Sequence, residues 1–406
     1  MAYVFGVVLF ALGICVSVAL HEAGHMVTAK AFGMKVRRYF VGFGPKVFSF
    51  RRGETEYGLK WIPLGGFCDI AGMTALDEVT PDEAPRAMWR FKTWKRTVVM
   101  AAGSVTHFIL GFVVLYLMAA TMGLPNLTAE PAISTVYDCV RDAQTDEEFA
   151  NPVCRPGDPA PAKSAGIQPG DEIVSINGQH TETYADVTTL VQPLSGPVAV
   201  EVERDGQVVP LTVDVVQVER PVQDPADPNG PDKIVSVGSL GLTFANMIPY
   251  NAATALGGAA GFTGDMFVQT WQRLMEFPER IPAVVSSIFG GERDPNTPVS
   301  VVGASRIGGE AVEQGLWSLF LLLLASLNFF VGVFNLLPLL PLDGGHIAVV
   351  WYERVRDWVR KLRGKGAGGP VDYSKLSAVT VVLVLIGGAV TLLTVTADIV
   401  NPIRLQ

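Results

Sequence analysis

The residues with the clearest chemical potential form the pentapeptide His21-Glu22-Ala23-Gly24-His25. On a helix, the two histidines share one face, with Cβ atoms about 6 Å apart. Two imidazoles on one face can bind a single Zn²⁺ ion, and a glutamate beside them can accept a proton from water. The pattern therefore predicts a catalytic zinc site with His21 and His25 as ligands and Glu22 as general base. The alternative is a pair of structural histidines near a helix end.

This pattern follows a long apolar segment at the start of the chain. Residues 1–20 carry no charged side chain and are almost wholly apolar from residue 4 onward. They lack the basic start and the small-residue cleavage site of a signal peptide. Ionisable groups at the end of a membrane span are costly and usually serve a function. We therefore expect a membrane span that runs into the metal motif.

The composition of the whole chain also indicates a membrane protein. Of its 406 residues, 49% are hydrophobic and only 17% are charged, which is unusual for a soluble protein. The net charge of −8 and the lack of a long basic run argue against a nucleic-acid partner. The four cysteines contain no C-x-x-C pair, which argues against a structural zinc site built from cysteines.

Four stretches are long and apolar enough to cross a bilayer, which takes about 20 residues. The expected fold class is a polytopic α-helical membrane protein with four transmembrane helices. These helices are assigned to residues 1–33, 97–122, 316–346 and 374–398. The intervening segments are a cytoplasmic loop at 34–96, a separate domain at 130–245, an amphipathic or re-entrant segment at 246–315 and a cytoplasmic loop at 347–373.

Basic residues indicate how the chain is oriented in the cell membrane. Lysine and arginine are frequent in segments 34–96 and 347–373, whereas few lie near the ends of the long segment between the second and third spans. We therefore expect segments 34–96 and 347–373 in the cytoplasm. Both chain termini and the domain at 130–245 then lie outside the cytoplasm, and the metal site faces the cytoplasmic side.

Two parts of the sequence have β-strand character. In residues 46–62, two runs of β-forming residues flank Arg52-Gly53, which predicts a hairpin associated with the membrane. Its free edge could hold an extended substrate by strand addition, although it could also be an ordinary cytoplasmic loop. Tight turns at Asn177-Gly178 and Asp205-Gly206 indicate a small β-rich domain of about 100 residues.

A catalytic zinc ion usually has a third protein ligand. The third span ends near Asp343-Gly344-Gly345-His346, and it runs in the same direction as the first span. Asp343 can therefore reach the depth of the two histidines. Pro338 and Pro341 break the helix before it, and the two glycines let the backbone turn the carboxylate inward. The alternatives are a helix-stop role for Asp343, or His346 as the ligand.

Together these motifs resemble the site-2 protease family of intramembrane zinc metalloproteases. The resemblance is carried by the pentapeptide at residues 21–25 and by Asn335…Pro338…Leu342-Asp343-Gly344. The hairpin between Phe43-Gly44-Pro45 and Gly65-Gly66 and the PDZ-like signature Ala165-Gly166-Ile167…Gly170-Asp171 also match. Residues 34–45 and 393–398 look like the actinobacterial member that performs regulated intramembrane proteolysis of anti-sigma factors.

The resemblance implies one Zn²⁺ per chain, bound by His21, His25 and Asp343, with Glu22 as general base. It implies that Asn335 contacts the substrate or the transition state. It further implies an extracytoplasmic PDZ domain at 130–245 that binds peptide C-termini and filters substrates. The substrates would be membrane-spanning proteins that have already been cleaved once, with anti-sigma factors as the main candidates.

One position departs from the family pattern. Many relatives have Gly-Pro-x-x-Asn in the second span, whereas this chain reads Gly103-Ser104-Val105-Thr106-His107. His107 lies about 15 Å along the helix from the cytoplasmic end, near the expected depth of the metal. A fourth protein ligand would fill the position that water needs. We therefore expect a neutral, hydrogen-bonded His107 beside the ligands or in the substrate cleft. The alternative is a histidine packed between helices away from the site.

Cys139 and Cys154 fall in the segment expected outside the cytoplasm, where disulfides persist, so we expect them to be bridged.

The rival functions are a membrane metal transporter or sensor, and an inactive receptor with a PDZ domain. A transporter needs polar groups across the whole membrane, but the sequence places them near one face. Intact Glu22 and Asp343 argue against an inactive receptor.

The choice between the two candidate third ligands is testable. Replacing Asp343 with alanine should lower the zinc content of the purified protein, because one of three ligands is lost. His346→Ala should leave the zinc content near that of the wild type. Elemental analysis that gives the reverse pattern would make His346 the ligand.

Overall fold

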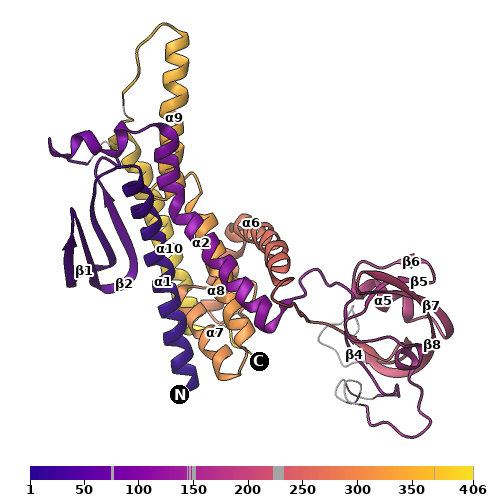
Figure 1. Ribbon diagram of the computed structural model, residues 1–406. Coiled ribbons are helices and arrows are strands. Elements are labelled where there is room, and N and C mark those ends of the chain that lie inside the picture. The colour runs from indigo at the N-terminus through magenta and orange to yellow at the C-terminus, as the bar shows by residue number, and fades with distance from the viewer. Residues whose placement is uncertain are drawn as a thin grey trace. The chain divides into compact units, whose positions relative to one another are not determined.

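A computed structural model describes residues 1–74, 77–143, 145, 148, 152–222, 233–369 and 371–405. For residues 63–64, 222, 233 and 374–375 it describes the backbone alone. The chain forms two compact units (Figure 1). The first combines Met1–Thr121 with Asn251–Gln406, and the second is Met122–Tyr250.

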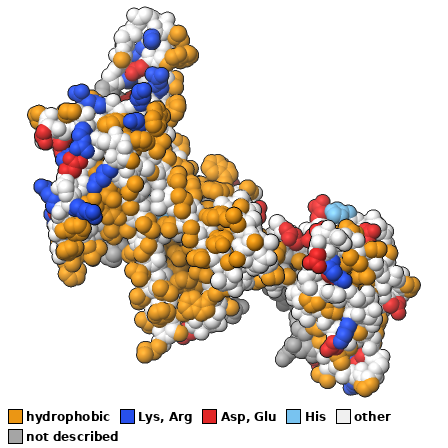
Figure 2. Space-filling view, viewed as in Figure 1, with side chains coloured by type: hydrophobic (Ala, Val, Ile, Leu, Met, Phe, Trp, Pro, Cys, Tyr) orange, Lys and Arg blue, Asp and Glu red, His pale blue; other side chains and the backbone are white. Residues whose placement is uncertain are grey.

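Among its described residues, the first unit contains four helices that are long and apolar enough to cross a membrane: α1 (Ala2–Ala31), α2 (Thr93–Met122), α8 (Trp317–Asn335) and the apolar part, Leu376–Val400, of α10 (Tyr373–Val400). Apolar side chains on α1 recur every fourth residue and are exposed, namely Val4, Val8, Leu12, Val16 and Leu20. Figure 2 shows hydrophobic side chains covering this unit. A bilayer can cover such a surface, so the expected polytopic membrane fold is confirmed at this level.

The described part of this unit also contains the helices α6 (Ala255–Ile288), α7 (Val301–Glu313) and α9 (Asp343–Leu362). The region expected as one span at 316–346 is two helices, because α8 ends at Asn335 and α9 begins at Asp343. Prolines within the break lack the N–H that a helix needs. The segment expected as a loop at 347–373 is also different, since α9 keeps it helical as far as Leu362.

The predicted hairpin exists and is longer than residues 46–62. It consists of β1 (Val36–Arg52) and β2 (Thr55–Ile70), which pair antiparallel around Gly53. Two hydrogen bonds fix it to α1: the Tyr39 hydroxyl donates to the Ala19 carbonyl at 2.6 Å, and Lys30 Nζ donates to the Tyr57 hydroxyl at 2.6 Å. Two short 3-10 helices, η1 (Ala84–Arg86) and η2 (Met88–Arg90), lead into α2.

The second unit is built on a five-stranded antiparallel sheet in the order β6-β5-β7-β8-β9. Its strands are β5 (Glu172–Ile176), β6 (Gln179–His180), β7 (Gly196–Arg204), β8 (Gln207–Val222) and β9 (Lys233–Ser239). Short pairs join β4 (Ile133–Val136) to β10 (Leu242–Phe244) and β3 (Leu124–Pro125) to β11 (Met247–Ile248). The helices in the described residues of this unit are α4 (Pro161–Ala165) and α5 (Tyr184–Val191). Alternate valines of β7 are buried in its core.

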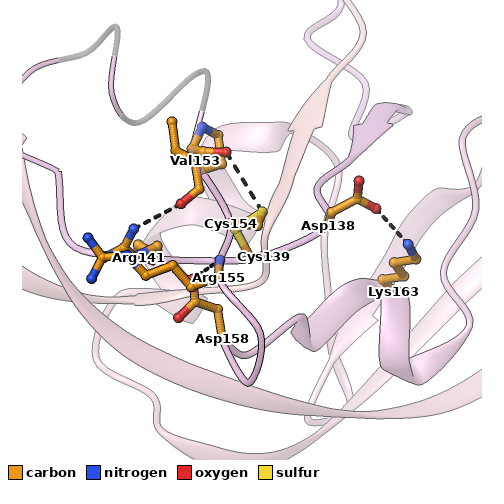
Figure 3. Close-up of a disulfide and its surroundings, with 9 residues drawn as sticks. Asp138, Cys139, Arg141, Val153, Cys154, Arg155, Asp158 and Lys163 are labelled. Carbon is orange, nitrogen blue, oxygen red and sulfur yellow. Dashed lines mark hydrogen bonds and ion pairs between the residues drawn. A yellow bond between two sulfur atoms is a disulfide. The ribbon is translucent and has the colours of Figure 1, made fainter.

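A disulfide joins Cys139 to Cys154 in this unit, with Cα atoms 5.6 Å apart (Figure 3). Arg141 lies beside it and donates to the carbonyl of Val153 at 2.8 Å. Closing a loop of this size stabilises a fold by about 3 kcal/mol. Cys15 and Cys68, both in the other unit, are not part of a disulfide.

A buried ion pair in the second unit makes its stability depend on pH. Asp171 is 1% exposed and accepts hydrogen bonds from Arg204 Nε and Nη2 at 2.7 Å and from the Gln168 N–H at 2.8 Å. Burial acts to raise the pKa of Asp171, but these hydrogen bonds and the Arg204 charge outweigh it and lower the pKa. A lowered folded-state pKa stabilises the fold above the unfolded pKa of about 3.9, and this contribution is lost as the pH falls.

We therefore predict that Asp171→Asn lowers the free energy of unfolding of this unit by about 2 kcal/mol at pH 7. The difference from wild type should shrink as the pH falls below about 4, because wild-type Asp171 then becomes protonated. Hydrogen exchange of β5 and β7 amides in the full chain measures the free energy of unfolding of the variant and of the wild type at each pH. A difference that stays constant from neutral to acid pH would contradict the prediction.

Candidate metal centre

Three predicted ligands lie together between the membrane-spanning helices. The Nε2 atoms of His21 and His25 are 3.2 Å apart, and Oδ2 of Asp343 lies 3.4 Å and 3.3 Å from them. Both histidines are buried, and Asp343 is partly buried. One ligand atom from each residue lies within 4.8 Å of the others. The fold thus brings together residues that are more than 300 positions apart in the sequence.

Helix α1 presents both histidines on the side that faces α2. The Nδ1–H of His25 donates to the carbonyl of Val99 at 2.7 Å, which leaves Nε2 available to a metal. At Gly103, a Cβ atom would lie only 2.5 Å from Nε2 of His25 and from Cε1 of His21. At Gly24, a Cβ would lie 2.7 Å from the Ala102 carbonyl. The close approach of the two helices therefore requires glycine on both sides.

Asp343 reaches the histidines because it is the first residue of α9. The two following glycines pack directly on the chain that leads into the helix. A Cβ at Gly344 would lie 2.2 Å from the Leu336 carbonyl oxygen, and a Cβ at Gly345 would lie 2.6 Å from the Leu340 nitrogen. Only glycines let the break fold back this tightly, and this fold turns the carboxylate toward α1.

The three candidate ligands and Glu22 line a cavity of about 280 Å³. Its other walls come from α2, from Met73 and from β2, where Gly66, Phe67 and Cys68 face the site. A Cβ at Gly66 would lie 3.0 Å from Cγ of Glu22, so this glycine lets the strand approach the carboxylate. The hairpin therefore forms one wall of the cavity that contains the proposed base.

His107 lies beside one of the two candidate histidine ligands. Its ring centroid is 5.0 Å from that of His21, and it is 2% exposed. Its Nδ1–H donates to Oδ1 of Asn328 on α8 at 2.9 Å, and the amide group of Asn328 donates to the Leu324 carbonyl. Among the described residues, the cluster of possible metal ligands consists of His21, His25 and Asp343, and His107 lies outside it. The role of His107 beside the candidate ligands stays a prediction.

Two other candidate residues are not part of the described ligand cluster. His346 Nδ1 is 3.4 Å from the Tyr373 hydroxyl, and its ring faces that of Tyr373, so it contacts the start of α10. Asn335 is the last residue of α8 and is not among the residues that line the cavity. Its expected role as a substrate contact stays a prediction.

Sequence reasoning missed the supporting residues. Val99 contributes a backbone carbonyl, which leaves no trace in the residue type. Asn328 sits inside an apolar span, and an amide at that depth is a signal that could have been used. The roles of Gly103 and Gly66 depend on helix and strand approach distances, which appear only in three dimensions.

The residues fit a zinc ion. Tetrahedral zinc with bonds of 2.0–2.1 Å separates its ligand atoms by about 3.3 Å, close to the spacing seen here. Among the described residues, Oδ2 of Asp343 is buried and has no hydrogen-bond partner. A buried anionic oxygen without a donor is costly unless a cation neutralises it. Two imidazoles and one carboxylate leave one zinc position open, as catalytic sites require.

Comparison with known proteins also points to a zinc enzyme. Residues 9–378 match peptidase family M50. The chain belongs to this family. It is 48% identical over 411 residues to the zinc metalloprotease Rip1 of Mycolicibacterium smegmatis and 47% identical over 408 residues to that of Mycobacterium tuberculosis, in both cases over all of both chains. It is 28% identical to metalloprotease MmpA of Caulobacter vibrioides, over 86% of this chain and 85% of that protein.

This M50 peptidase is therefore a multi-pass membrane protein and a zinc-dependent intramembrane metalloprotease. The predictions of the family, of the enzyme class and of the zinc cofactor are confirmed.

The packing at Gly103 gives a direct test of the centre. We predict that Gly103→Ala lowers zinc affinity by at least about tenfold, because the added methyl group pushes the ligating rings out of place. Gly387→Ala is the matched control, since nothing lies within 4 Å of a Cβ at that position of α10. Zinc retention against a chelator measures the effect. Equal retention by the two variants would contradict the packing argument.

Proposed function

We propose that His21, His25 and Asp343 bind the zinc ion of this M50 peptidase and that Glu22 is its general base. The observation that carries the proposal is the meeting of all four side chains in one cavity between membrane-spanning helices. When bound, zinc supplies a Lewis acid that activates water and polarises the peptide carbonyl. Glu22 accepts the proton of the attacking water and then delivers it to the leaving amine.

The hairpin supports a role in substrate binding. A peptide bond in a helical span is hidden in the backbone hydrogen-bond ladder, so the substrate must unwind before it is cut. Inside a bilayer the exposed backbone groups need new partners. We infer that β2, which lines the cavity through residues 66–68, offers its backbone to the unwound strand. Asn335 near the end of α8 would provide a further polar contact.

The proposed orientation places the metal centre toward the cytoplasm. Lysine and arginine gather at the end of the first unit that carries the hairpin and α9 (Figure 2). Basic residues beside spans favour the cytoplasmic side. Both chain termini and the second unit would then lie outside the cytoplasm, on the outer side of the cell membrane.

The second unit is proposed to be a PDZ domain. A groove of about 440 Å³ runs between α5 and the segment from Gly238 to Phe244. In the described part of the chain β10 pairs only with β4, which leaves its other edge open to a peptide strand. Valines of α5 and Leu240 and Leu242 provide an apolar wall. Such a groove suits a peptide C-terminus exposed by an earlier cut.

The proposed substrates are membrane proteins that another protease has already shortened, with anti-sigma factors as the leading candidates. The Rip1 resemblance and the combination of a membrane-embedded metal site with a peptide groove support this class. A transporter remains disfavoured, because the described metal ligands form one cluster and not a path.

The role of Glu22 is tested by Glu22→Gln. We predict that this variant keeps its zinc and loses at least about 10²-fold in turnover, because general-base transfer contributes 10²–10⁴-fold. Turnover is measured on a membrane-anchored candidate in lipid nanodiscs, and zinc by elemental analysis. An empty site in the variant would make Glu22 a ligand, and undiminished turnover would remove it from the chemistry.

A further inference from the structure

Helix α9 carries an exposed apolar stripe that the proteolytic chemistry does not use. Trp351, Val355, Trp358 and Leu362 follow one another at spacings of four, three and four residues, so they share one helix face. Their exposed fractions are 48%, 53%, 59% and 68%. We call these four residues the α9 ladder. Large exposed apolar surfaces usually mark interaction sites.

The opposite face of α9 is covered by the chain itself. Arg360 Nε donates to the Gly366 carbonyl at 2.8 Å, the Gly368 N–H donates to Asp357 at 2.9 Å, and the Val371 N–H donates to Glu353 at 2.8 Å. The segment that returns to α10 therefore runs along the polar side of the helix. This arrangement leaves the ladder as the open side.

The C-terminal end of the ladder, at Leu362, lies beyond the apolar layer of a bilayer. Arg96, near the start of α2, forms an ion pair with Glu353 at 3.1 Å, and such charges belong at the membrane surface. From there to Leu362 the helix rises by about 13 Å. The headgroup layer is only about 5–8 Å thick. Figure 1 shows the last turns of α9 standing clear of the other elements.

The charges around the ladder are positive. Arg354 and Lys361 are exposed beside it, and Arg363 and Lys365 follow its end. The two acidic residues of this stretch, Glu353 and Asp357, are engaged on the covered face. A second copy of α9 would bring like charges together. An amphipathic helix with acidic edges would match both the apolar stripe and its margins.

We propose that the α9 ladder binds an acidic amphipathic helix in the cytoplasmic segment of the substrate, next to the span that is cut. Asp343 is both a proposed zinc ligand and the first residue of α9, so a chain leaving the metal centre toward the cytoplasm emerges beside this helix. This inference rests on the proposed cytoplasmic orientation of the site. The ladder then selects substrates by a segment that is not itself cleaved.

The test uses the full chain in phosphatidylcholine nanodiscs and two substrates with the same span. One continues into an acidic amphipathic helix, and the other into a Gly/Ser segment of equal length. The wild type should show a KM about tenfold lower for the first substrate. Trp358→Ser/Leu362→Ser should reduce this ratio to less than twofold. Tyr352→Ser, an exposed aromatic of α9 outside the ladder, should keep the tenfold ratio.

A binding measurement separates this inference from the proposed proteolytic function. The labelled acidic helix alone should bind Glu22→Gln nanodiscs, and the ladder substitutions should weaken its affinity about tenfold by fluorescence anisotropy. Equal KM values for the two substrates in the wild type, or a ladder variant that keeps the preference, would overturn the inference. Equal binding of a basic amphipathic helix would also overturn it. Peptide binding without cleavage of either substrate would refute the proposed function alone.

Discussion

The close approach of α1 and α2 is the constraint on which the metal centre depends. At Gly103 and Gly24 the helices meet where any side chain would overlap a ligand ring or a backbone carbonyl. This contact places the Val99 carbonyl against His25 and so fixes which imidazole nitrogen faces the metal position. Without it, the histidines would still lie on one face of α1, but nothing would orient their rings.

Burial of polar groups in an apolar bundle makes this arrangement demanding. At another point of the first unit, Arg293 and Asp398 form a nearly inaccessible ion pair at 2.7 Å, and Asp398 also accepts the Ser300 N–H at 2.6 Å. That carboxylate is neutralised by the protein itself. Asp343 faces two imidazoles and keeps an oxygen without a hydrogen-bond donor. Asp398 therefore has the surroundings of a structural ion pair, whereas Asp343 has those expected of a metal ligand.

Much of this architecture could be predicted from the sequence because membrane burial leaves strong patterns. Span length, the spacing of His21 and His25 and the glycines after Asp343 are all local features. The end of α8 at Asn335 and the helical α9 were missed, since the prolines mark a break but not how the chain resumes. Supporting contacts such as Asn328 with His107 join helices more than 200 positions apart, and no local pattern encodes such a pairing.

The central claim is that two histidines and one aspartate hold a single catalytic zinc. Zinc X-ray absorption spectroscopy on the full chain in nanodiscs measures the ligand types directly. We expect two imidazoles with oxygen donors completing the shell, and loss of the protein oxygen in Asp343→Ala. A sulfur shell would implicate Cys68, which lines the same cavity, and a third imidazole would implicate His107 or His346. Either result would contradict the proposed centre.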